Sequence, residues 1–336
     1  MKRFISLTML VAAVVCGMVC VRANADSSPP KRRVLVVKSR DISFYAPASQ
    51  GFVKGLKSRG YGDTTDITIL ALSGDKNQDQ QTIKAQIQKN NSLIFTLGTD
   101  ATRTIAEAHP TCPCVFSMIL DPISLGVAKS LAQPGGVFTG TTLQVSAGKQ
   151  LDALQQILPQ AQKVGLLYTD GDATSLAFLS AATQDAAKLN IEIVSKAMTP
   201  TTDRKAALEE LAGKVGAFWL IVDPASAGPQ ALADTLDVAK SHKLPVLGTS
   251  SANVHAGALL ALSANLQDLG DVNAEMAAPL LDGSAQPGQT SVRGPRQTML
   301  SVNLDAASAL GLTVPNSVLR LADEVVDSGA AKSGSK

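Results

Sequence analysis

Short apolar runs alternate with amphipathic segments along most of the chain. The runs at 33–38, 92–97 and 163–168 are rich in Val, Ile and Leu, which is typical of buried β-strands. The segments between such runs have helical spacing, as at 78–90, where Ile83 and Ile87 share one face. This alternation predicts parallel sheets with helices on both faces.

The alternation occurs in two series, which predicts two doubly wound α/β lobes. The first series has strands at 33–38, 66–70, 92–97, 113–120 and 137–143, and helices at 46–61, 78–90, 99–109 and 121–132. The second has strands at 163–168, 191–196, 217–222, 244–248 and 258–262, and helices at 175–190, 203–214 and 228–243. A helix at 266–283, a strand at 295–304 and a short helix at 305–312 follow. The late helix and strand could complete both lobes, so we expect the chain to cross between them more than once.

The stretch SLAQPGGVFTGTTL, residues 130–143, contains a Pro-Gly-Gly turn that could be a phosphate loop or a hinge. A phosphate loop needs a strand, then glycines, then a helix whose amides point at the anion. Here the predicted order is helix, turn, strand, and neither GxxxxGK[ST] nor GxGxxG occurs in the mature chain. The order therefore favours a hinge.

The N-terminus has the pattern of a cleavable secretory signal peptide, residues 1–25. A positively charged start precedes an apolar core, and Ala-Asn-Ala precedes Asp26. A retained membrane anchor is one alternative, and a lipoprotein is another. Cys16 and Cys20 lie in this segment, but the Val before each is too bulky for the usual lipobox. We expect export to the periplasm.

Cleavage of this segment removes three basic residues and no acidic ones, which leaves 27 Lys+Arg against 28 Asp+Glu. A nearly neutral chain gives no electrostatic reason to expect nucleic acid or anionic lipid as a partner. The remaining chain of about 311 residues exceeds one ordinary core, so two domains are expected.

Two cysteines remain in the mature chain, Cys112 and Cys114. Two residues apart on a strand, their side chains would share a face, but a bridge across so short a loop is strained. Buried, inert thiols are one interpretation and a labile disulfide is the other. No metal site is expected, because no Cys or His ligands have a suitable spacing.

One central stretch, VFSMILDPISLGVAKSLAQPGGVFTGTT, resembles the signature of ABC-transporter periplasmic substrate-binding proteins of the tryptophan/tyrosine type. The Asp121-Pro122 pair, Gly126 and the Pro-Gly-Gly turn before Thr139-Gly140 carry the resemblance. It extends over nearly the whole mature chain, through GFVKGLKSRGY (51–61), ILPQAQKVGLLYT (157–169), AGALLALSANLQDLG (256–270) and VNLDAASALGLTVPNSVLRLADEVV (302–326).

The resemblance implies a class I periplasmic-binding-protein fold, with two Rossmann-like lobes joined by a hinge of about three crossovers. The strand after the Pro-Gly-Gly turn would itself be the first crossover. Residues 31–140 plus 265–290 would form lobe 1 and residues 141–264 plus 291–327 lobe 2. Residues 328–336 are expected to be a disordered tail.

The function implied is that of a non-catalytic receptor. It would capture a small ligand, with an amino acid as a candidate, by hinge closure and deliver it to an ABC permease in the inner membrane. A monomer without a cofactor is expected. A ligand-sensing protein with a signalling partner is the alternative. An enzyme is not expected, because the three histidines lack metal spacing and no GxSxG motif occurs.

Ligands of open α/β sheets bind beyond the carboxyl ends of the strands. An α-amino acid needs donors for its carboxylate, an acid for its ammonium group and an apolar or aromatic wall. Free amides at the start of a helix could serve the carboxylate, and Asp121 or Asp223 could face the ammonium. Together with the positions matching the family pattern, the candidate ligand-binding residues are Thr99, Asp121, Tyr168, Ser175, Asp223, Tyr45 and Ser250.

Five of the seven candidates have a structural alternative. Tyr45 could pack under its loop. Thr99 could be only an N-cap, Asp121 a cap of the helix after it, and Tyr168 a core residue at a strand end. Asp223 before a proline could open a turn, where tryptophan-type members tend to have Asp-Asn instead. Arg40 near the cleft could favour an acidic ligand, or could be an ordinary exposed loop arginine.

Overall fold

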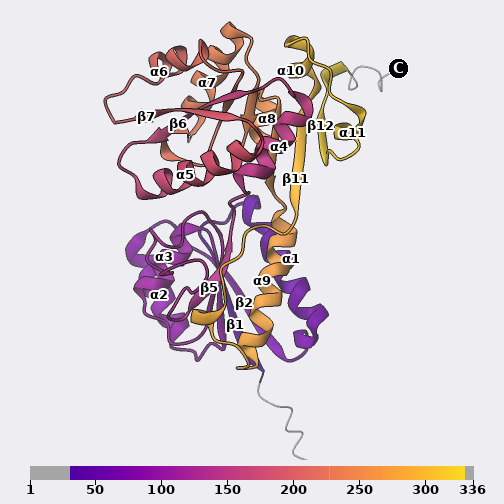
Figure 1. The fold of residues 1–336 in the computed structure, drawn as a ribbon. Helices are drawn as coiled ribbons and strands as arrows, with labels where there is room; N and C mark the ends of the chain where they lie inside the picture. The colour runs from indigo at the N-terminus through magenta and orange to yellow at the C-terminus, as the bar shows by residue number, and fades with distance from the viewer. Residues whose placement is uncertain (1–30, 227, 330–336) are drawn as a thin grey trace, which may run out of the picture.

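Residues 31–226 and 228–329 of the computed structural model form two lobes, one above the other in Figure 1. The lower lobe has a five-stranded sheet in the order β2-β1-β3-β4-β5. The upper lobe has a seven-stranded sheet in the order β12-β11-β10-β9-β8-β6-β7. Neighbouring strands are parallel except β10 and β11, which are antiparallel. The predicted pair of α/β lobes is confirmed.

In the lower lobe, helices cover both faces of the sheet. Alternate residues of its first strand point to opposite faces, so Val34 and Val36 pack on α1 and α9, while Leu35 and Val37 pack with α2 and α3. The strands are β1 (Arg32–Lys38), β2 (Thr65–Ala71), β3 (Leu93–Leu97), β4 (Cys114–Ile119) and β5 (Phe138–Thr142). The helices are α1 (Ala46–Leu56), α2 (Lys76–Ile87), α3 (Thr99–Glu107) and α9 (Leu266–Leu281).

The upper lobe is layered in the same way. Leu166 and Trp219 pack with α4 and α5 on one face, while Leu167 and Phe218 pack with α6 and α7 on the other. The strands are β6 (Lys163–Thr169), β7 (Glu192–Met198), β8 (Ala217–Trp219), β9 (Val246–Gly248), β10 (Leu260–Ala264), β11 (Thr298–Asn303) and β12 (Glu324–Val326). The helices are α4 (Ala147–Ile157), α5 (Ala173–Lys188), α6 (Arg204–Ala212), α7 (Gly228–His242), α8 (Ser251–Ala256), α10 (Leu304–Ala309) and α11 (Asn316–Leu319).

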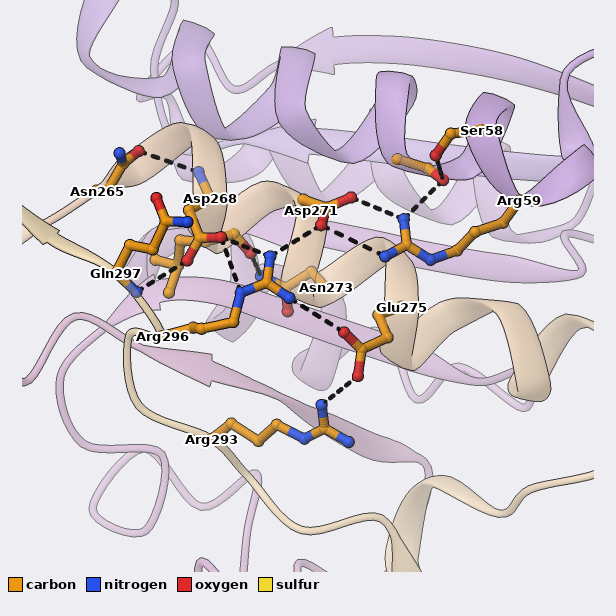
Figure 2. Close-up of polar contacts among 12 residues, drawn as sticks. Ser58, Arg59, Asn265, Asp268, Asp271, Asn273, Glu275, Arg293, Arg296 and Gln297 are labelled. Atoms are coloured by element: carbon orange, nitrogen blue, oxygen red, sulfur yellow. Dashed lines mark hydrogen bonds and ion pairs between the residues drawn. The ribbon is translucent and has the colours of Figure 1, made fainter.

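The chain passes between the two sheets three times: after β5, between β10 and α9, and just before β11. The second and third crossovers lie together, because the Asn265 amide donates to the Gln297 carbonyl over 3.1 Å. Figure 2 shows how the third is held on α9 by Arg296, which donates to Asp268 over 2.5 and 3.0 Å and to Asp271 over 2.9 Å. The third crossover is therefore fixed to α9 of the lower lobe, and the second lies beside it.

The helix predicted at 121–132 is wrong, because this segment is a series of turns. The Asp121 carboxylate accepts from the amides of Ile123 and Ser124 over 2.8 and 3.1 Å, and Gly126 has a φ of 77°. A side chain that bonds nearby amides competes with the helical ladder, and a residue in the left-handed region interrupts it.

The Pro-Gly-Gly turn is not the hinge itself. It precedes β5, and the Gly135 amide donates to the Gly288 carbonyl of the lower lobe over 3.0 Å. The first crossover follows the opposite end of β5, after Thr142.

Several elements have no counterpart among the predicted ones: α4, α8, α11 and β12. Leu151 and Leu154 of α4 do have helical spacing, whereas α8, α11 and β12 are too short to leave a periodic signal. The predicted signal peptide and residues 330–336 of the predicted tail lie outside the described residues. The amide of Ser328, the first residue of the predicted tail, donates to the Asp305 carboxylate over 3.0 Å. No helix in the described ranges is long and apolar enough to cross a membrane.

Candidate functional site

A cavity of about 450 Å³ lies between the two sheets. It is at the carboxyl ends of the parallel strands, where ligands of open α/β sheets bind. The lower lobe contributes residues that follow β1, β4 and β5, and the upper lobe contributes residues that follow β6, β8 and β9 together with the adjoining ends of β10 and β11. The residues that line it include Phe44, Leu120, Gln144, Thr174, Ser175, Phe178, Val222, Asp223, Thr249, Ser250, Ser251, Ser263 and Met299.

Aromatic side chains reach the cavity from both lobes. Phe44 is 50% exposed and meets Tyr45 edge-on, with 5.6 Å between ring centroids. Phe178 of α5 packs on Trp219, with 5.5 Å between centroids. Val222 and Met299 add further exposed apolar surface to the same wall. A ligand with a large apolar body would bury this surface, which is favourable.

Asp223 is the charged residue among those that line the cavity. It follows β8 and is 5% exposed. Its Oδ1 accepts from the Thr169 hydroxyl over 2.6 Å and from the Ala225 amide over 2.7 Å, while Oδ2 accepts from the Thr169 amide over 3.3 Å. These bonds fix the carboxylate in the loop, so it does open a turn and also lines the cavity.

Two predicted hydroxyl residues also line the cavity, and both lie at the starts of helices. Ser175 donates its amide and its hydroxyl to the Asp172 carboxylate, each over 2.8 Å. Ser250 caps α8 by accepting from the Asn253 amide over 3.4 Å. Both hydroxyls are therefore placed at the upper wall by local hydrogen bonds.

Asp121 adjoins two lining residues, Leu120 and Thr174, and is not itself among the residues that line the cavity. Its carboxylate accepts from the hydroxyl of Thr174, which belongs to the other lobe. Ser124 and Thr174 hydroxyls are also 2.9 Å apart, so the two lobes touch here. Burial opposes ionisation of Asp121, but hydrogen bonds from Ser124, Thr174 and Ile123 outweigh it and lower the pKa of the carboxyl.

The structure places the other three predicted residues away from the cavity lining. Thr99 is the first residue of α3, and its predicted role as N-cap is wrong, because Gly98 occupies that position with a φ of 92°. Tyr45 packs on the core of the lower lobe and Tyr168 on the core of the upper lobe. Ligand contact stays a prediction for all seven candidates.

Some lining residues carried no signal in the sequence. Phe178, Val222 and Met299 are apolar residues in apolar segments, and only the folded arrangement shows that they face a cavity. Arg40 does not line it: the guanidinium donates to the Ser39 carbonyl over 2.6 Å and pairs with Asp100 over 3.3 Å.

Cys112 and Cys114 are free thiols, with Cys114 buried and Cys112 half-buried. A hydrogen bond from the Cys114 thiol lowers the pKa of Cys112, while burial raises the pKa of Cys114. Within residues 31–226 and 228–329, no group of three His, Cys, Asp or Glu is arranged to hold a metal ion.

Comparison with known proteins bears directly on this arrangement. The chain is 26% identical over 267 residues to the tyrosine-binding protein of Clostridioides difficile. The aligned residues cover 79% of this chain and 76% of that protein. A Streptococcus pneumonia ABC domain solved in complex with L-Trp is 25% identical, with a TM-score of 0.65 over 88% of this chain and all of that one. A ligand-free, open substrate-binding protein with adhesive properties from Clostridium difficile is also 25% identical, with a TM-score of 0.75 over 88% of this chain and 99% of that one.

The fold is the class I periplasmic-binding-protein fold, as the resemblance implied. A more distant neighbour, the periplasmic ribose ABC transporter structure from Conexibacter woesei, shares it at 15% identity and a TM-score of 0.53. A model of the family described as ABC transporter substrate binding protein matches residues 39–326. This family and the relatives above comprise substrate-binding proteins and not enzymes. The chain therefore belongs to the ABC transporter substrate-binding protein family.

Proposed function

We propose that this protein is the solute receptor of an ABC transporter and that its ligand is an amino acid with an aromatic side chain. The observation that carries the proposal is the cavity between the lobes, which is walled by Phe44 from one lobe and Phe178 from the other. Aromatic walls favour an aromatic ligand by stacked or edge-on contacts. The relatives named for tyrosine binding and solved with L-Trp support the same ligand class.

Capture would occur by closure of the two lobes about the three crossovers. The ligand would contact both walls only in the closed form, so binding would shift an existing equilibrium towards closure. The proposed lobes are residues 31–140 plus 265–290 and residues 141–264 plus 291–327. The proposed contacts include the seven predicted residues, with Ser175, Asp223 and Ser250 already at the cavity.

Delivery would follow export through the predicted signal peptide. The closed, liganded monomer would dock on an ABC permease in the inner membrane and release the amino acid there. The family to which the chain belongs supports this role.

A thermal-shift panel on the mature protein, stripped of bound solute, tests the ligand class. L-Tyr, L-Trp and L-Phe would be compared with other amino acids, nucleosides, sugars and small organic acids. A ligand at 100 times its Kd adds about 2.7 kcal/mol of stability, which corresponds to roughly 5–10 °C for lobes of this size. The expected result is a shift of this size with an aromatic amino acid. A shift with sugars or nucleosides and none with amino acids would overturn the proposal.

A further inference from the structure

A hydrogen-bonded contact joins the two lobes away from the crossovers. The Thr174 hydroxyl, in the first turn of α5, donates to the carboxylate of Asp121, which follows β4 in the lower lobe. The hydroxyl oxygens of Ser124 and Thr174 are 2.9 Å apart. None of these three residues belongs to a crossover, so a rotation of the lobes about the crossovers changes the distances within this contact.

The Asp121 carboxyl fixes the direction of both hydrogen bonds. Burial raises the pKa of this carboxyl, but hydrogen bonds from Ser124, Thr174 and Ile123 outweigh it, so the group is an ionised acceptor at neutral pH. Thr174 gives its single hydroxyl proton to Asp121, and its oxygen therefore accepts from Ser124. The resulting chain from Ser124 through Thr174 to Asp121 is cooperative, because each bond polarises the next.

The lower-lobe side of the contact is held in place by its own loop. Oδ1 of Asp121 accepts from the amides of Ile123 and Ser124 over 2.8 and 3.1 Å, and Oδ2 accepts from Thr174. Groups that are already ordered lose little conformational freedom when they meet a partner. The contact is therefore prepared before the lobes approach.

The upper-lobe side of the contact belongs to the wall of the cavity. Thr174 lines the cavity, as do Ser175 and Phe178 farther along α5. Asp121 and Ser124 are not among the residues that line it. The contact thus ties a ligand-facing helix to the opposite lobe from outside the ligand's space.

We infer that Asp121 and Ser124 are positioning residues that hold α5 against the lower lobe and so favour the closed cleft. Loss of the contact lowers the population of the binding-competent form and raises the apparent Kd of the ligand by the same factor. The inference rests on the proposed function for the choice of ligand, whereas the arrangement of the lobes is measured without one. This role of Asp121 is separate from its predicted contact with the ligand.

Ser124→Ala tests the contact with the smallest change. It removes the donor to Thr174 and keeps the amide that binds Asp121. We expect the Kd for L-Tyr in titration calorimetry to rise about 3- to 10-fold, the size expected for one hydrogen bond. The radius of gyration of the unliganded protein in small-angle X-ray scattering should increase, and saturating L-Tyr should restore the wild-type liganded value.

Ser130→Ala is the matched control. Ser130 lies in the same series of turns, and its hydroxyl donates to the Gln133 carbonyl over 3.1 Å and accepts from the Gln133 amide over 3.0 Å. These bonds stay within one loop of the lower lobe. Both the Kd and the radius of gyration should therefore match the wild type.

A second pair of variants separates positioning from ligand contact at Asp121. Asp121→Ala removes the acceptor, whereas Asp121→Asn puts an amide that can donate to Thr174 in place of Oδ2. Asn should recover most of the affinity that Ala loses, because the Thr174 hydroxyl accepts as well as donates. A ligand ammonium group held by Asp121 would instead make both variants lose at least about 30-fold, and this result would overturn the positioning role.

The charge of Asp121 also acts on Asp172 across the cleft. Hydrogen bonds from Ser175 lower the pKa of Asp172, and the negative charge of Asp121 opposes this effect. Asp121→Asn removes this repulsion between the lobes while it keeps a hydrogen-bonding group opposite Thr174. The repulsion is a further reason to expect recovery of affinity in Asp121→Asn.

The outcomes separate this inference from the proposed function. An unchanged radius of gyration in Ser124→Ala and Asp121→Ala would overturn the inference, whatever the affinities are. An increased radius with an unchanged Kd would also overturn it, because the contact would then not serve binding. If the wild type binds neither L-Tyr nor L-Trp, the proposed ligand fails and the scattering comparison alone decides the inference. Circular dichroism confirms that each variant folds.

Discussion

Glu324 is the residue through which the last strand supports the wall of the cavity. Its carboxylate accepts from the hydroxyls of Ser251 and Ser301, the second over 3.0 Å, and lies 2.7 Å from His255 Nε2. Ser251 in turn lines the cavity. The hydrogen bonds from Ser251 and His255, which exceed the opposing effect of burial, lower the pKa of Glu324.

A Glu324→Gln variant should therefore lose stability in a pH-dependent way. A carboxyl whose pKa is lowered by folding stabilises the native state above its unfolded pKa, and this contribution disappears as the pH falls through the folded pKa. The difference in free energy of unfolding between wild type and variant should be fully present at about pH 6 and shrink as the pH falls below about 4.5. Urea unfolding at several pH values measures it. A difference that is constant from about pH 6 to pH 3 would contradict this role of the charge.

At the residue scale, the sequence predicts polar lining residues better than apolar ones. Asp223 and Ser250 stand out because they follow predicted strands, and strand ends meet at one edge of a sheet. Phe178 and Met299 could not be found in the same way, because an apolar side chain in an apolar segment is indistinguishable from a core residue. Asp121 shows a further limit, since its partner Thr174 is brought to it only by the approach of the two lobes.

The helices α1 and α9 come from opposite ends of the chain and pack with their backbones in close contact. A Cβ atom added to Gly270 would lie 2.1 Å from the Ala48 carbonyl oxygen, and one added to Gly51 would lie 2.1 Å from the Gln267 carbonyl oxygen. Both glycines are required by this approach and not by backbone conformation. The pair completes one face of the lower sheet, as the adjacent helices in Figure 1 show.

Gly270→Ala should destabilise the protein by at least about 2 kcal/mol, because the helices must separate to admit the methyl group. Gly213→Ala is the control, since a Cβ there meets nothing within 4 Å, and its effect should stay within about 0.5 kcal/mol. Chemical denaturation of both variants measures these changes. Equal stability of the two variants would mean that the helix pair relaxes without cost.

At the element scale, helices and strands with a strong hydrophobic period are predicted well. Segments in which a side chain competes for the backbone amides are not. The apolar runs at 33–38 and 163–168 became β1 and β6, and the late helix at 266–283 became α9. The segment 121–132 has helix-forming residues, but the Asp121 side chain takes the amides that a helix would use. Short elements such as α8 and β12 are set by packing on their neighbours, which a single sequence does not show.

The third crossover decides how the two lobes are joined at the scale of the whole molecule. Arg296 lies on it and contacts Asp268, Asp271 and Glu275, carboxylates three and four residues apart on one face of α9 (Figure 2). The Gln297 amide donates to the other oxygen of Asp268 over 3.0 Å. The sequence predicts that the chain returns between lobes, but not that one arginine anchors the return.

Arg296→Gln should cost about 2 kcal/mol of stability, because the Asp268 side chain, 7% exposed, would lose its counter-ion. The figure allows for the 47% exposure of the arginine, which weakens the pair. Arg293→Gln, three residues earlier on the same connection, is the matched control. Its pair with Glu275 is exposed on both sides, at 48% and 42%, so its loss should cost less than about 1 kcal/mol.

Urea unfolding of the two variants measures this difference, and the thermal shift with bound ligand provides a second readout. Neither arginine lines the cavity, so the ligand-induced shift should match that of the wild type in both variants. A reduced shift in Arg296→Gln alone would mean that the anchor also sets the equilibrium between open and closed lobes. Equal stability of the two variants would instead mean that the hydrogen bonds of the Asn265 and Gln297 backbone amides hold the crossover, and not the arginine side chain.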